Sequence, residues 1–132
     1  MRKVITFGVF DCFHYGHLEL FRRCRELGDY LIVAVHDDKH VKINKPNCEC
    51  YFNETKRLEM VKAVRYVDEA LLYSQIDEDL PNIDFDILAV GPDQTNPHFQ
   101  KAFEWCKAHN KEVIALSRTP NISSTEIRKS KK

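Results

Sequence analysis

Residues 30–35, YLIVAV, are the stretch that decides the fold, because all six are apolar or aromatic. A short run without polar alternation is typical of a strand covered on both faces, as in a parallel sheet. Residues 4–7, VITF, form a second such run, which ends at Gly8. Five strands are expected, at residues 4–7, 30–35, 69–73, 85–90 and 112–116.

Between these strands the apolar residues recur at helical spacing. Helices are expected at residues 15–27, 54–64, 97–109 and 123–129. Strands that alternate with helices imply right-handed crossovers, and so predict an α/β, Rossmann-like, doubly wound parallel sheet flanked by helices. Residues 36–53 are polar and are expected to form one long loop, a feature that is usually functional in a compact domain.

The whole chain, residues 1–132, is expected to be one domain, in which 20 basic residues balance 20 acidic ones. A formal net charge of zero provides no overall field to attract nucleic acid or a membrane, and we expect neither as a partner. No apolar run is long enough for a membrane span or a signal peptide, so a cytoplasmic location is expected. The five cysteines are odd in number and irregularly spaced, which predicts reduced thiols and no zinc site.

The first strand is followed by residues 8–17, GVFDCFHYGH. His14 and His17 fall at the start of a helix, where free backbone N–H groups and the helix dipole favour a phosphate. Gly16 lets a ligand approach the backbone closely. Imidazoles in this position can stabilise a phosphoryl group in its transition state. The alternatives are a structural histidine, or half of a metal site with Cys12, although no third ligand has convincing spacing.

A second polar motif follows the last strand, at residues 118–127, RTPNISSTEI. Ser123 and Glu126 have the spacing of a helix capping box, and three hydroxyl residues surround that helix start. Arg118 is able to bind two phosphate oxygens at once. Taken alone, this motif would equally fit an ordinary capped helix with a surface arginine.

The two motifs together resemble a known family. Residues 14–17 look like the HxGH signature of the nucleotidyltransferase superfamily, and residues 118–125 are similar to the RTxGISTT signature of its cytidylyltransferase branch. The likeness to small glycerol-3-phosphate cytidylyltransferases covers almost the entire chain. It implies transfer of CMP from CTP to a small phosphorylated acceptor, with release of pyrophosphate.

The resemblance also implies roles for individual residues. His14 and His17 would stabilise the transition state at the α-phosphate, Arg118 would hold the leaving phosphates, and Lys42 or Lys45 would reach over them. The nucleotide would lie against Gly8, Val9, Phe10, Asp11, Gly16, Arg65, Gly91, Asp93, Thr119, Ile122, Ser123, Ser124 and Thr125. Mg²⁺ would be held mainly by substrate oxygens and water, and the chain would form a homodimer.

The sequence departs from the family pattern after Gly91, where Gly-Asp-Asp-Trp becomes GPDQTNPH at residues 91–98. Polar groups replace the tryptophan, so we expect the acceptor to contact Gln94, Thr95, Asn96 and His98. The acceptor is then glycerol 3-phosphate or a more polar compound such as phosphoglutamine. An adenylyltransferase and a catalytically silent nucleotide-binding domain remain as alternatives, and the paired histidines and Arg118 argue against the silent domain.

Overall fold

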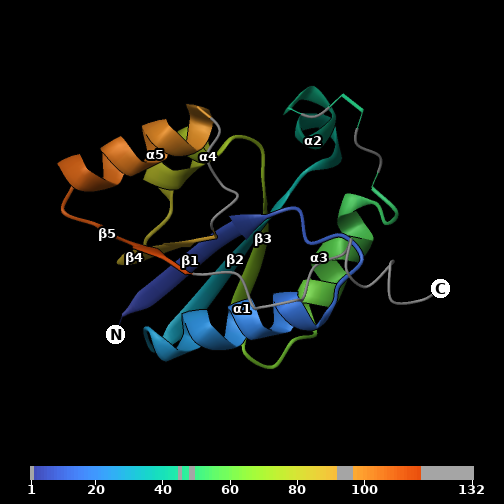
Figure 1. Cartoon of the computed structure of the whole chain (residues 1–132), viewed down its shortest axis with the longest axis horizontal. Helices are drawn as coiled ribbons and strands as arrows, with labels where there is room; N and C mark the ends of the chain where they lie inside the picture. The colour runs from blue at the N-terminus through green and yellow to red at the C-terminus, as the bar shows by residue number, and fades with distance from the viewer. Residues whose placement is uncertain (1, 45, 48–49, 92–96, 117–132) are drawn as a thin grey trace.

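The computed structural model of the chain describes residues 2–44, 46–47, 50–91 and 97–116. Five parallel strands form one sheet in the order β3-β2-β1-β4-β5 (Figure 1). The strands are β1 (Lys3–Gly8), β2 (Tyr30–His36), β3 (Glu69–Tyr73), β4 (Ile87–Val90) and β5 (Glu112–Ala115). The predicted Rossmann-like, doubly wound sheet is confirmed, and all five strands overlap their predicted residues, although β4 begins two residues later than predicted, at Ile87.

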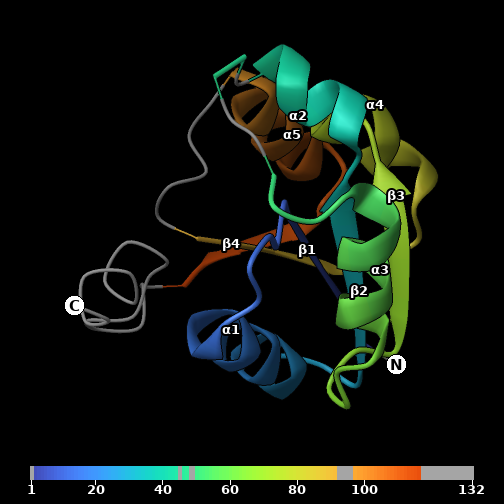
Figure 2. The same ribbon diagram turned by 90° about the vertical axis from the view of Figure 1, so that its right-hand side faces the viewer.

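Helices cover both faces of the sheet. The helices are α1 (Tyr15–Glu26), α2 (Asp38–Asn44), α3 (Glu54–Lys62), α4 (Ile76–Asp79), the 3₁₀ helix η1 (Leu80–Asn82) and α5 (Pro97–Ala108). Figures 1 and 2 show α1 and α3 on one face of the sheet and α4 and α5 on the other. Helix α2 lies beyond the carboxyl end of β2 (Figure 1).

Strand β2 shows why the apolar runs do not alternate with polar residues. Ile32 and Ala34 belong to the core beneath α4 and α5, whereas Leu31 and Val33 belong to the core beneath α1 and α3. Because successive side chains of a strand point to opposite faces, both faces need apolar residues. The two cores thereby fix the sheet that carries the polar loops at its edge.

The expectation of one loop over residues 36–53 is wrong for residues 38–44, which form α2. Asp37 caps this helix, since its Oδ1 accepts a hydrogen bond from the His40 amide at 2.8 Å. Helix α2 has one buried residue, Val41, so it lacks the apolar stripe by which a helix is recognised in a sequence. Helices α4 and η1, in the segment after β3, were likewise not predicted, and the helix expected at residues 123–129 lies outside the described residues.

Four cysteines belong to the described residues, and none of the four forms a disulfide: Cys12, Cys24, Cys50 and Cys106. Burial raises the pKa of the Cys24 thiol to about 12, which keeps it protonated. Cys48 lies outside the described residues. Among the helices that the structure describes, none combines the length and apolar character that a membrane crossing requires.

Candidate active site

The site lies where the strand order reverses, between β1 and β4. The chain turns outward in opposite directions from these two neighbouring strands, which pair in parallel with Thr6 opposite Ala89. In open α/β sheets this switch point leaves a crevice at the carboxyl ends of the strands. Helix α1 begins shortly after β1 ends, so the predicted histidine motif lies at this crevice.

His14 and His17 form a reciprocal cap at the N-terminus of α1. The Nδ1 atom of His14 accepts a hydrogen bond from the Gly16 amide at 3.0 Å, and the Nδ1 atom of His17 accepts one from the His14 amide at 3.3 Å. The two rings are stacked with their centroids 4.0 Å apart. The backbone of the helix start therefore sets the position of both imidazoles.

These contacts also determine which nitrogen carries the proton. An Nδ1 atom that accepts a hydrogen bond is unprotonated, so each neutral ring bears its proton on Nε2. Burial lowers the pKa of His14. Burial, aided by the neighbouring His14, lowers the pKa of His17 to about 4, against a smaller opposing effect of Asp11. At neutral pH the pair therefore presents two uncharged Nε2–H donors, and no metal-binding lone pair on Nδ1.

Phe10 supports His17 from the loop that follows β1. Its backbone is left-handed, with φ of 56°, and its ring contacts those of His17 and Phe21 edge-on, at centroid distances of 5.6 and 5.1 Å. A Cβ atom on Gly8 would lie 2.7 Å from the Phe10 ring, so any larger residue there would have to displace that ring. Since the Phe10 side chain is buried, only its backbone is available to the nucleotide it was predicted to contact.

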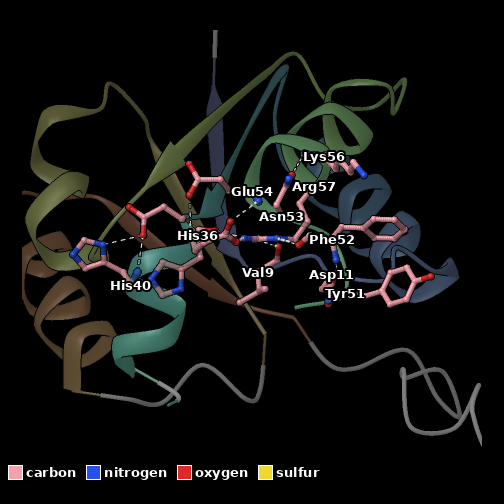
Figure 3. Close-up of polar contacts among 12 residues, drawn as sticks. Val9, Asp11, His36, His40, Tyr51, Phe52, Asn53, Glu54, Lys56 and Arg57 are labelled. Atoms are coloured by element: carbon pink, nitrogen blue, oxygen red, sulfur yellow. Dashed lines mark hydrogen bonds and ion pairs between the residues drawn. The ribbon is translucent and has the colours of Figure 1, made fainter. Parts of the chain in front are cut away.

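The Asp11 carboxylate binds backbone amides from a distant segment (Figure 3). It accepts hydrogen bonds from the amides of Tyr51, at 2.6 Å, and Phe52, at 3.0 Å. Asp11 was predicted to contact nucleotide, and its carboxylate here joins the loop after β1 to the segment before α3. We infer a positioning role for this side chain.

Arg57 was not predicted as a site residue, and it is the largest fully buried side chain among the residues that the structure describes. Its guanidinium donates to the carbonyls of Val9 at 2.9 Å, His36 at 2.8 Å and Phe52 at 3.0 Å (Figure 3). It also pairs with the Asp38 carboxylate at 2.5 Å. Position 57 lies one helical turn before the apolar residue Val61, so the two residues share a face of the helix. This spacing in the sequence could have predicted that Arg57 faces the core.

The remaining predicted residues fall into two groups. Those in the described part are Lys42, exposed on the last turn of α2; Arg65, exposed after α3; Gly91, which follows β4; and His98, whose Nδ1 lies 2.8 Å from Asp77 Oδ1. The others lie outside the described residues: Lys45, Asp93, Gln94, Thr95, Asn96, Arg118, Thr119, Ile122, Ser123, Ser124 and Thr125. The structure therefore brings the histidines together with the loop after β1. The roles of the second motif, at residues 118–127, stay predictions.

The stability of the protein is expected to depend on pH through His17. Between pH 6.5 and about 4 the unfolded chain binds a proton at this residue and the folded chain does not, so stability falls as the pH falls through that interval. This lowering of the His17 pKa corresponds to a loss of up to about 3 kcal/mol in the free energy of unfolding. Urea unfolding at several pH values measures it, with His17→Asn as the comparison. If the free energy of unfolding depended equally on pH in wild type and variant, the lowered pKa could not be assigned to His17.

Comparisons with known proteins show the family of the chain. The chain matches the Cytidylyltransferase-like family over residues 5–130. It is 38% identical over 131 residues to a glycerol-3-phosphate cytidylyltransferase of Staphylococcus aureus, covering 97% of this chain and 93% of the relative. It is also 38% identical over 119 residues to a FAD synthase of Thermococcus kodakarensis, covering 86% and 78%.

A solved structure supports the fold independently. The lipopolysaccharide core biosynthesis protein of Thermoplasma volcanium superposes with a TM-score of 0.75 at 26% identity, covering 90% of this chain and 97% of that one. The fold and the matched family thus define an α/β nucleotidyltransferase. The chain belongs to the cytidylyltransferase-like family, as the two sequence motifs predicted.

Proposed function

We propose that this enzyme transfers CMP from CTP to a small phosphorylated acceptor. The observation that carries the proposal is the pair of neutral histidines held by reciprocal capping at the switch point of the sheet. Their two Nε2–H groups are suited to bind oxygens of the α-phosphoryl group, where charge develops in the transition state. The matched relative from Staphylococcus aureus is named a glycerol-3-phosphate cytidylyltransferase, which is an enzyme of this kind.

The reaction is an in-line displacement at the α-phosphorus. An oxygen of the acceptor's phosphate forms the new bond to phosphorus, and the bond to the bridging oxygen breaks. Pyrophosphate leaves with that electron pair, and no covalent enzyme intermediate is needed. The protein supplies position and charge stabilisation. In this proposal Arg118 and residues 123–125 hold the leaving pyrophosphate and Arg65 contacts cytosine, within one domain spanning residues 1–132.

Cytidylyltransferases generally use a divalent metal ion, and we propose Mg²⁺ for this chain. Within residues 2–44, 46–47, 50–91 and 97–116, no three His, Cys, Asp or Glu side chains are grouped to hold a metal. Both Nδ1 atoms of the histidine pair are occupied by backbone amides. The oxygens of the triphosphate, with water, are then the principal ligands of the ion, whose charge would offset that of the phosphates.

The acceptor is proposed to be glycerol 3-phosphate or a more polar compound such as phosphoglutamine, bound in part by residues 94–98. Adenylyl transfer is the second candidate, because a FAD synthase is among the matched relatives and FAD contains an adenine nucleotide. We further propose a homodimer in the cytoplasm, which light scattering on the purified protein and fractionation of cells would test.

CTP is expected to be used far better than ATP, because a site that hydrogen-bonds one base edge leaves polar groups unpaired with another. Pyrophosphate release with each nucleoside triphosphate and a panel of phosphorylated acceptors measures this preference. Excess EDTA should abolish the activity and added Mg²⁺ should restore it. Comparable kcat/KM values for ATP and CTP would favour the adenylyltransferase, and full activity in EDTA would contradict the metal proposal.

A further inference from the structure

A cleft of about 460 Å³ lies between α2 and the start of α3. Its lining includes Val41 and Lys42 of α2, Tyr51, Phe52 and Asn53 of the chain leading into α3, and Lys56 of the first turn of α3. Val41 is buried, whereas the Tyr51 side chain is 78% exposed. The cleft thus offers an apolar floor, an aromatic ring and two ammonium groups to a ligand.

Among the residues that the structure describes, the walls of this cleft do not compensate its positive charge. Asp38 is the one carboxylate of this described lining, and it pairs with the buried Arg57 at 2.5 Å and accepts a hydrogen bond from the Glu54 amide. Lys42 and Lys56 have no ion-pair partner in the described part of the chain. In a protein whose formal net charge is zero, two unpaired cations beside one cleft favour an anionic ligand.

The cleft is joined to the histidine loop by hydrogen bonds. The amides of Tyr51 and Phe52 donate to Asp11, three residues before His14. Figure 3 shows Tyr51, Phe52 and Lys56 on the same side of this contact network as Asp11. A ligand in the cleft would therefore lie beside the loop that leads to the catalytic imidazoles.

We propose that this cleft receives the phosphorylated acceptor and that Lys56, with Lys42, binds its anionic group. The inference rests on the proposed function and specifies the acceptor subsite. It also predicts a substrate class, because two cations and a neutralised carboxylate disfavour an acceptor with an ammonium or trimethylammonium tail. Acceptors with an uncharged or carboxylate-bearing tail are preferred over phosphorylated amines.

Lys56→Gln should raise KM for the acceptor about 10- to 100-fold, the usual effect of one hydrogen bond to a charged group, and leave KM for CTP unchanged. Lys56→Glu should raise it further and should narrow the preference for glycerol 3-phosphate over phosphoethanolamine. Lys62→Gln is the matched control, because Lys62 is an exposed residue of the same helix outside the cleft. Thermal unfolding checks that each variant is folded.

Two results for Lys56→Gln would overturn the proposal. One is an increase in KM for CTP alone, and the other is no change in KM for CTP or for any acceptor. Comparing glycerol 3-phosphate with 3-phosphoglycerate, which adds a carboxylate without an ammonium group, identifies the bound group. An equal effect on both acceptors assigns Lys56 to the phosphate, and an effect on 3-phosphoglycerate alone assigns it to the carboxylate. Calorimetric titration of each acceptor into wild type and Lys56→Glu tests the cleft without turnover. If the wild type released no pyrophosphate but bound glycerol 3-phosphate through Lys56, the proposed function would be refuted. The cleft would still stand as a binding site for the acceptor.

Discussion

Replacing His17 by asparagine is expected to lower kcat by about 10²–10³-fold while the fold persists. Asparagine has an acceptor oxygen near the position of Nδ1, so the hydrogen bond from the His14 amide is retained. It has no donor at the position of Nε2, so the contact to the transition state is lost. His14→Asn should behave in the same way, since the Nδ1 of His14 accepts from the Gly16 amide.

Comparison with alanine separates the two roles of these histidines. His17→Ala loses both the cap and the donor. It should therefore have the same kcat as His17→Asn, with a free energy of unfolding lower than that of His17→Asn by about 1 kcal/mol. Single-turnover kinetics and urea unfolding supply the two readouts. His109→Asn is the control, because His109 is exposed beyond the end of α5. Near-normal turnover by both folded asparagine variants would remove the histidines from the catalytic site.

Arg57→Met is expected to reduce the free energy of unfolding by about 3–5 kcal/mol, because it leaves a buried network without its cation. The carbonyls of Val9, His36 and Phe52 lose their donor and Asp38 loses its ion-pair partner. Arg57→Lys should recover little of this loss, since an ammonium cannot reproduce the geometry of the planar guanidinium.

Chemical denaturation measures the effect, with Arg65→Met as the control. Arg65 is exposed, so its loss should leave stability within about 0.5 kcal/mol of wild type. The proposed contact with cytosine predicts that the same control raises KM for CTP. An Arg57→Met protein as stable as Arg65→Met would show that the buried network contributes nothing to folding.

The sheet and the position of the histidine pair at the start of a helix were predictable from the sequence because each depends on local patterns. A continuous apolar run indicates burial on both faces, as in β2, and the spacing of His14 and His17 places them together at the N-terminus of α1. Helix α2 was missed because a polar N-cap and one buried residue define it. The network around Arg57 was missed because it joins residues 21 and 48 positions away along the chain. Pairings over such distances leave no periodic signal in a sequence.

The bonds of Arg57 and Asp11 connect three segments that are far apart in sequence, around residues 9–11, 36–38 and 51–54. Loops over the carboxyl edge of a sheet commonly open independently of the core. Here the amides of Tyr51 and Phe52 can exchange with solvent only after their bonds to Asp11 break, so their hydrogen exchange should be slow for residues this close to the surface. These three segments are then ordered before substrate arrives, and little of the binding free energy is spent on ordering them.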